Sequence, residues 1–154
     1  MNPEGKTLRR EFKSRQSGKN PMHKITVRID FCYGHRLLEY EGKCAHPHGH
    51  NGVLEVEISS AGLDGRGMVC DFGEAKARLR ALVEEKLDHK MLLHESDVLV
   101  GALRSVGEEP FVLRVNPTAE NMARLIFEEA RALHLPVTAV RLWETLSACA
   151  EYRE

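Results

Sequence analysis

The segment CAHPHGH, residues 44–50, concentrates side chains that bind transition metals. It contains Cys44 and three histidines at alternate positions, His46, His48 and His50. On an extended strand His48 and His50 point to the same face and lie about 6.5–7 Å apart, so both imidazoles can reach one zinc ion. The segment therefore predicts a metal site.

A third ligand must come from elsewhere in the chain. His35 is the best placed, because it follows the first predicted strand and pairing would bring that strand alongside His48 and His50. Three histidines leave one position of a tetrahedral zinc ion open, which is the arrangement of a catalytic centre. Cys44 would then be free to act beside the metal.

Two other arrangements fit the same residues. The histidines could be exposed without a metal, or Cys44 could join His48, His50 and one more ligand in a closed structural site. On an extended chain Cys44 would lie about 13 Å from His48, so the closed site requires a bend at Pro47. The H-x-H spacing together with a distant third histidine favours the catalytic arrangement.

Two further groups could do acid–base or binding chemistry. Asp88 precedes His89 in KLDHK, and a carboxylate beside an imidazole orients it and raises its basicity. The same pair can simply cap a helix end. Glu144, in the apolar segment VRLWETL, is either an exposed residue of an edge strand or an anchor for a ligand with adjacent N–H donors. The local sequence leaves both choices open.

Hydrophobic periodicity and turn residues predict the elements that must position these groups. They are a strand from His23 to Phe31, a strand at 52–59, a turn at 61–67, a helix capped by Asp71, a short helix or ordered loop at 97–107, a strand at 110–115, a helix from Thr118 to Pro136, and a strand at 137–152. This order is typical of an α+β fold, with an antiparallel sheet and helices on one face. The other face must then meet solvent, a ligand or another subunit.

Composition bounds the class of protein. The chain of 154 residues suits a flexible basic tail at 1–22 and a single domain at 23–154. Its net charge of −1 and the lack of a long apolar run predict no nucleic-acid or membrane partner. The four cysteines form no C-x-x-C pair, and the N-terminus has no signal-peptide core, so we expect free thiols and a cytoplasmic location.

Six segments together resemble the 6-pyruvoyl-tetrahydropterin synthase and 6-carboxytetrahydropterin synthase family. They are FCYGHRL (31–37), KCAHPHGHN (43–51), GMVCDFGEAK (67–76), LDHKML (87–92), NPTAENMARLIFEEA (116–130) and WETLSACAEY (143–152). The resemblance extends from about residue 23 to residue 152, which is nearly everything except the tail.

The resemblance implies a T-fold (tunnelling-fold) subunit, a four-stranded antiparallel sheet with helices packed on one face. Such subunits associate through their sheets, so a homohexamer built as a dimer of trimers is expected, with active sites at subunit interfaces. The implied enzyme is a zinc-dependent carbon–oxygen lyase that converts 7,8-dihydroneopterin triphosphate with loss of triphosphate. Zn²⁺ is the only cofactor implied.

The resemblance also implies a role for each matching residue. The zinc ligands are His35, His48 and His50; the proton-abstracting base is Cys44, with Asp88 and His89 as its relay; Glu144 grips the pterin ring, and Thr118 and Glu120 line its pocket. Capping and helix packing explain Thr118 and Glu120 equally well. Because family sites lie between subunits, His89 can serve a site whose zinc belongs to a neighbour.

Two products are compatible with these residues. The 6-carboxy product of the deazapurine (queuosine) route is favoured, and the alternatives are the 6-pyruvoyl product of the biopterin route and a zinc- and pterin-binding module without turnover. The chain departs from the family pattern at CYG (32–34), where a small residue and alanine are usual, and at Gly52, where an aromatic residue is common. His46 and His94 are additional imidazoles.

Overall fold

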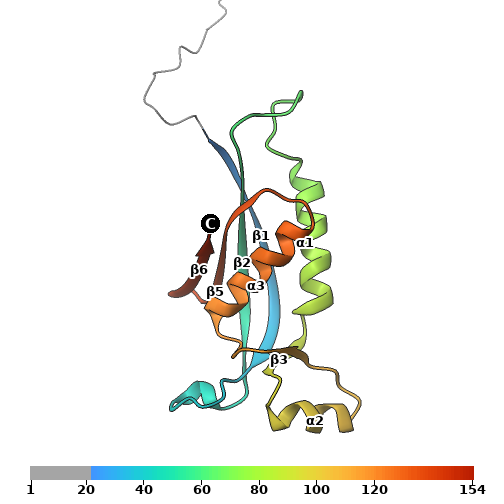
Figure 1. Cartoon of the computed structure of the whole chain (residues 1–154), viewed down its shortest axis with the longest axis vertical. Helices are drawn as coiled ribbons and strands as arrows, with labels where there is room; N and C mark the ends of the chain where they lie inside the picture. Colours follow the sequence, from blue (N-terminus) through green and yellow to red (C-terminus); the bar gives the residue numbers. More distant parts are fainter. Residues whose placement is uncertain (1–21) are drawn as a thin grey trace, which may run out of the picture.

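The structure is a computed structural model that describes residues 22–154, so the predicted tail, apart from Met22, lies outside the described residues. Figure 1 shows a long β1–β2 hairpin, with α1 and α3 packed along it and α2 near one end. No helix of the described part is long and apolar enough to cross a bilayer. The elements are β1 (His23–His35), η1 (Lys43–Ala45), β2 (His48–Ser60), α1 (Phe72–Lys86), β3 (Lys90–His94), α2 (Val98–Ser105), β4 (Phe111–Leu113), α3 (Ala119–Ala132), β5 (Val137–Thr145) and β6 (Ala148–Arg153).

The strands form one sheet of six in the order β4-β3-β1-β2-β5-β6. The α+β class is confirmed, but the expected four-stranded antiparallel sheet is wrong, because β3 pairs parallel with β1 and β4 pairs parallel with β3. The pattern missed β3 because its hydrophobic run, MLL, is too short to show a period. The strand predicted at 137–152 is two strands, because the chain turns at Leu146 and Ser147.

One face of the sheet carries the hydrophobic core. Alternate residues of the central strands, such as Ile29, Leu54 and Leu142, are fully buried. They form one cluster with Leu79 of α1 and Phe127 of α3, so both long helices cover the same face, as predicted. The outward-facing residues of β1 are exposed. The helices therefore leave the opposite face of the sheet uncovered within one chain.

The β1–β2 hairpin determines which residues meet at its closed end. The strands are 13 residues each and pair antiparallel from His23 and Ser60 to His35 and His48. The end of β1 and the start of β2 therefore lie together, at the lower end of the molecule in Figure 1. That end is held by the segments around β3 and the start of α3, which makes it the natural place for a site.

The helices begin at side chains that accept hydrogen bonds from their first turns. Asp71 and Thr118 accept from the backbone N–H three residues later, as the capping pattern predicts. Asp97 caps α2 and also binds Arg36 through two hydrogen bonds of 2.6 and 2.5 Å. Asp97 is 4% exposed, and the hydrogen bonds from Arg36 hold the pKa of its carboxyl below the usual range. This ion pair fixes α2 to the segment directly after His35.

Asp97→Asn should lower the free energy of unfolding by about 1.5–3 kcal/mol at pH 7, the usual contribution of hydrogen bonds to a charged group. The folded pKa of Asp97 lies below its unfolded value of about 3.9, so its stabilisation is present above that pH and is lost as the pH falls through the folded pKa. The deficit, measured by urea unfolding, should shrink below about pH 4. The exposed Glu108→Gln is the control. An equal deficit at pH 7 and at pH 3 would show that the pair contributes no pH-dependent stability.

Candidate active site and metal centre

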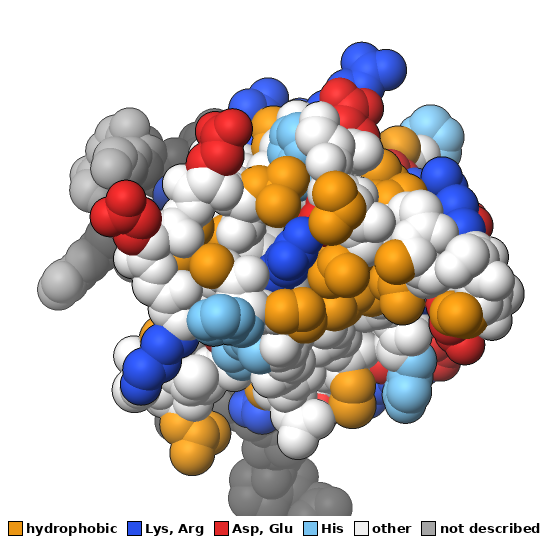
Figure 2. Space-filling view, turned by 90° about the horizontal axis from the view of Figure 1, so that it is seen from below, with side chains coloured by type: hydrophobic (Ala, Val, Ile, Leu, Met, Phe, Trp, Pro, Cys, Tyr) orange, Lys and Arg blue, Asp and Glu red, His pale blue; other side chains and the backbone are white. Residues whose placement is uncertain are grey.

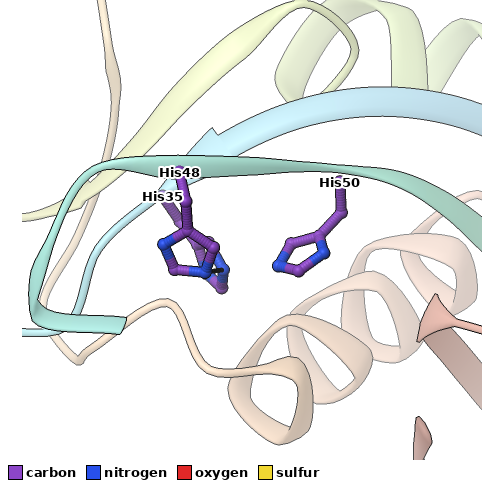
Figure 3. Close-up of side chains that lie close together, drawn as sticks. All are labelled: His35, His48 and His50. Carbon is purple, nitrogen blue, oxygen red and sulfur yellow. Dashed lines mark hydrogen bonds between the residues drawn. The ribbon is translucent and has the colours of Figure 1, made fainter. Parts of the chain in front are cut away.

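His35, His48 and His50 gather at the closed end of the hairpin. The strand register pairs His35 with His48 and Tyr33 with His50, which places all of these side chains on the core face. Figure 3 shows the three rings projecting from the two strands to the same side. Their centroids are 4.5, 5.0 and 5.1 Å apart, and one nitrogen of each lies within 4.8 Å of the others. The structure thus brings the three predicted ligands together.

Backbone carbonyls fix the tautomer of two of the rings. His35 Nδ1 lies 2.7 Å from Pro117 O, and His48 Nδ1 lies 2.8 Å from His46 O. A carbonyl oxygen only accepts, so each Nδ1 must carry its proton and donate. Each Nε2 is then left with a lone pair, and the two Nε2 atoms are 3.0 Å apart (Figure 3). Metal-binding histidines in proteins are commonly oriented by such second hydrogen bonds.

These nitrogens fit a metal ion well. Two lone pairs facing each other at 3.0 Å repel unless a cation or proton lies between them. His50 Nε2 is buried without a hydrogen-bond partner among the described residues, and an unsatisfied buried nitrogen is costly. His35 is 2% exposed, and burial lowers its pKa, which favours the neutral imidazole that metals require. The donor set suits zinc, which accepts three imidazoles and leaves a position for a ligand.

Glu144 stands directly beside this cluster. Its Oε1 lies 3.7 Å from His35 Nε2 and 4.0 Å from His50 Nε2. Tyr33, a residue that sequence reasoning did not assign to the site, donates a 2.9 Å hydrogen bond to the same oxygen. Burial and the nearby carboxylate raise the pKa of Tyr33, so its hydroxyl remains a donor. Tyr33 could have been recognised from its spacing, because a residue two positions before a strand ligand faces the same side.

Two clefts meet at Glu144. One, of about 240 Å³, is lined by the predicted ligand His35, the predicted base Cys44 and all three predicted pterin-binding residues, Thr118, Glu120 and Glu144. The other, of about 550 Å³, is lined by His50, Trp143 and Glu144 among others. Figure 2, which views this end of the molecule, shows histidine side chains at the surface around a group of hydrophobic ones. The structure therefore places the predicted base and the predicted binding residues in one cleft.

Short local contacts hold the cleft in shape. Cys44 lies in η1, and its carbonyl accepts a 2.8 Å hydrogen bond from Leu37 N, which closes the loop between the strands. Asn116 binds both the N–H and the carbonyl of Leu38 through its side chain, at 2.8 and 2.9 Å. This clamp places the neighbouring Pro117 carbonyl against His35 and starts α3 at Thr118. Thr118 is thus both a helix cap and a cleft residue.

Asp88 and His89 lie outside the cleft that contains Cys44. Asp88 Oδ1 accepts a 2.9 Å hydrogen bond from Cys32 N and lies 3.0 Å from His89 Nδ1. Cys32 points to the face of the sheet opposite His35, and neither Asp88 nor His89 lines the cleft that contains Cys44. The side chain of His89 is 79% exposed, and its backbone is left-handed, with φ 57°. The pair is oriented for proton transfer, but one chain does not bring it to Cys44.

The two additional histidines have local explanations. The carbonyl of His46 orients His48, whereas the side chain of His46 is exposed. His94 Nδ1 accepts a 3.0 Å hydrogen bond from Ser96 N in the turn before α2. Neither side chain belongs to the cluster of His35, His48 and His50, whose geometry suits a metal ion.

Known proteins are similar to this chain over nearly all of its described part. The family model for 6-pyruvoyl tetrahydropterin synthase matches residues 24–154. The chain belongs to this family. Among curated members, 6-carboxy-5,6,7,8-tetrahydropterin synthases of Rickettsia bellii and Haemophilus influenzae are 36% and 30% identical to it, over 84% and 86% of this chain and 99% and 100% of theirs.

A further family member, 6-pyruvoyl tetrahydrobiopterin synthase of Dictyostelium discoideum, is 38% identical over 68% of this chain and 76% of its own. In fold, the chain is similar to the 6-pyruvoyl tetrahydropterin synthase of Caenorhabditis elegans, with a TM-score of 0.66 and 23% identity over 87% of this chain and 96% of that one. This T-fold structure matches nearly the whole described part of the chain.

Loss of a hydrogen bond that supports a metal ligand costs roughly 10–100-fold in metal affinity. His48→Ala and His50→Ala each remove a ligand itself, so each should weaken zinc binding by more than that. Zinc at about 100 times its dissociation constant should stabilise the unsubstituted protein by about 2.7 kcal/mol, and the same concentration should give these variants almost no gain. Calorimetric titration and thermal unfolding measure both effects. His23→Ala, at the opposite end of β1, is the control. Equal zinc affinity in all four proteins would exclude this cluster as the metal centre.

Proposed function

We propose that this protein is a zinc-dependent 6-carboxy-5,6,7,8-tetrahydropterin synthase that acts on 7,8-dihydroneopterin triphosphate. The observation that carries the proposal is the single cleft in which a metal-binding histidine, a thiol and a carboxylate meet, lined by His35, Cys44 and Glu144. That combination provides a Lewis-acid position, a base and a ligand anchor within one small space.

Each residue has a task that follows from its position. The Glu144 carboxylate accepts hydrogen bonds from adjacent N–H groups of the pterin ring and so fixes the ring in the cleft. Cys44, as the thiolate, removes a proton from the carbon chain attached to the ring. Zinc bound by the three Nε2 atoms would polarise the hydroxyl groups of that chain and make its C–H bonds more acidic. The carbon chain loses triphosphate and is oxidised by two electrons as the dihydropterin ring is reduced by two, so the reaction requires no redox cofactor. Release of acetaldehyde to leave the 6-carboxy group consumes one water molecule.

The choice of product is supported by the relatives. Two relatives named 6-carboxy-5,6,7,8-tetrahydropterin synthase, those of Rickettsia bellii and Haemophilus influenzae, match 84% and 86% of this chain. The relative named for the 6-pyruvoyl product matches 68% of it. The 6-carboxy product, formed with loss of acetaldehyde, is therefore the proposed one. The product belongs to a route toward deazapurines.

We further propose that the complete site forms between subunits of a homo-oligomer. Asp88 and His89 are paired, and His89 is exposed, yet both lie outside the cleft of their own chain. The face of the sheet that they adjoin is left uncovered by helices. Association through that face would bring His89 of the partner subunit to Cys44, where Asp88 orients its imidazole for proton transfer. A homohexamer built as a dimer of trimers is the proposed assembly.

Incubation of the zinc-loaded protein with 7,8-dihydroneopterin triphosphate should yield the 6-carboxy product and acetaldehyde, detected by mass spectrometry. Cys44→Ala should reduce turnover by about 10²–10⁴-fold, the usual contribution of a positioned base. It should leave the zinc content unchanged, because Cys44 is not part of the histidine cluster. Cys149→Ala, which removes a second thiol from the same cleft, is the control.

The outcomes separate the candidate functions. A 6-pyruvoyl product would assign the protein to the biopterin route. Zinc and pterin binding without turnover, unaffected by Cys44→Ala, would make it a binding module. Unfolding on chelation would identify a structural metal site.

Co-expression of Cys44→Ala and His89→Ala chains tests the shared site. If each site takes Cys44 from one subunit and His89 from another, random mixing leaves about one quarter of the sites with both residues intact. Mixed oligomers should then recover about a quarter of the activity, although each variant alone is nearly inactive. Mixed oligomers that stay as inactive as the parents would mean that both residues act within one chain.

A further inference from the structure

Tyr33 connects three parts of the site through one side chain. It is 4% exposed and lies two residues before His35 on the same face of β1. Its ring stands edge-on to the His35 ring at a centroid distance of 5.3 Å and tilts against the His50 ring at 5.6 Å. Its hydroxyl reaches Glu144 on β5. A residue that contacts two metal-binding rings and the ligand anchor is placed to control how they are arranged.

The ring is held firmly in this position. On one side it stacks on Phe31, with centroids 5.3 Å apart and planes inclined by 22°. On the neighbouring strand it passes over Gly52, where an added Cβ would lie 2.9 Å from Tyr33 Cε1. A Cβ at that distance is too close for any ordinary contact, so glycine at position 52 makes room for the ring. The hydroxyl therefore has little freedom to move away from Glu144.

Glu144 Oε1 lies almost as close to two of the histidine nitrogens as a fourth ligand of the same zinc ion would. Two atoms bound to one tetrahedral zinc ion by bonds of about 2.0–2.1 Å are about 3.4 Å apart. The distances from Oε1 to His35 Nε2 and His50 Nε2 are only slightly longer, 3.7 and 4.0 Å. A small rotation would bring the carboxylate into the fourth position, and the Tyr33 hydrogen bond opposes that rotation.

We propose that Tyr33 is a positioning residue that holds Glu144 beside the metal centre but out of its fourth coordination position. Tyr33 uses one of the roughly four acceptor sites of the carboxylate. No hydrogen bond to Glu144 Oε2 occurs among the described residues, so that oxygen remains available to the clefts. The effect of Tyr33 on metal binding follows from geometry alone, whereas its effect on pterin binding rests on the proposed function.

Tyr33→Phe tests this directly, because it removes the hydroxyl and retains the ring. Released from Tyr33, Glu144 should bind the metal, so zinc affinity should rise about ten-fold. Affinity for neopterin, a pterin without phosphate, should fall about ten-fold, as expected for loss of a hydrogen bond to a charged group. Calorimetry measures zinc binding, and quenching of neopterin fluorescence measures the second constant.

Tyr152→Phe is a matched control, because Tyr152 also donates to a glutamate, Glu154, at 3.0 Å but on the far strand of the sheet. It should change neither constant. In a Glu144→Gln background, Tyr33→Phe should have no further effect on zinc affinity, since Tyr33 acts through the carboxylate.

Opposite changes in the two affinities support the proposal. A parallel loss of zinc and neopterin binding would show that Tyr33 only supports the structure, and no change in either would show that its hydroxyl has no role; both results overturn the inference. If the unsubstituted protein binds zinc but neither binds neopterin nor converts the triphosphate, the proposed function fails, and the change in zinc affinity alone decides the role of Tyr33.

Discussion

The register of the β1–β2 hairpin is the constraint on which the site depends. His35 faces His48, and Tyr33 faces His50, only because the strands pair without a slip over their 13 residues. A shift of one residue would move either strand's ligands to the opposite face. The same alternation buries Ile29 and Leu54 in the core. The free energy of core burial therefore also brings His35, His48 and His50 together at the end of the hairpin.

Backbone groups from other segments complete what the register begins. The carbonyls of Pro117 and His46 assign the protons of the two facing rings and direct their Nε2 lone pairs toward one point. Asn116 holds the Pro117 segment to the loop after β1, and Asp97 holds Arg36 in the same loop. Few side chains are therefore dedicated to the site alone, because hydrogen bonds that cap helices and close loops also position the histidines.

The elements with a strong hydrophobic period could be predicted from the sequence, and so could the histidines with a distinctive spacing. Both long helices, their caps at Asp71 and Thr118, and the meeting of His35 with the H-x-H pair could be anticipated from pattern alone. The short strand β3 could not, because three hydrophobic residues carry no period. The separation of His89 from Cys44 depends on which face of the sheet each adjoins, and that is a property of the folded chain.

The contact between Tyr33 and Gly52 makes the effect of a substitution at one position depend on the residue at the other. A side chain at position 52 is incompatible with the ring in its present place, whereas a small residue at position 33 would leave only a cavity over Gly52. A cavity costs stability in proportion to its volume, but a Cβ placed 2.9 Å from Tyr33 Cε1 forces the ring or the backbone to shift. A side chain at position 52 is therefore tolerated only where position 33 holds a residue smaller than tyrosine. Substitutions at the two positions are non-additive, because the same change at one is neutral or harmful according to the residue at the other.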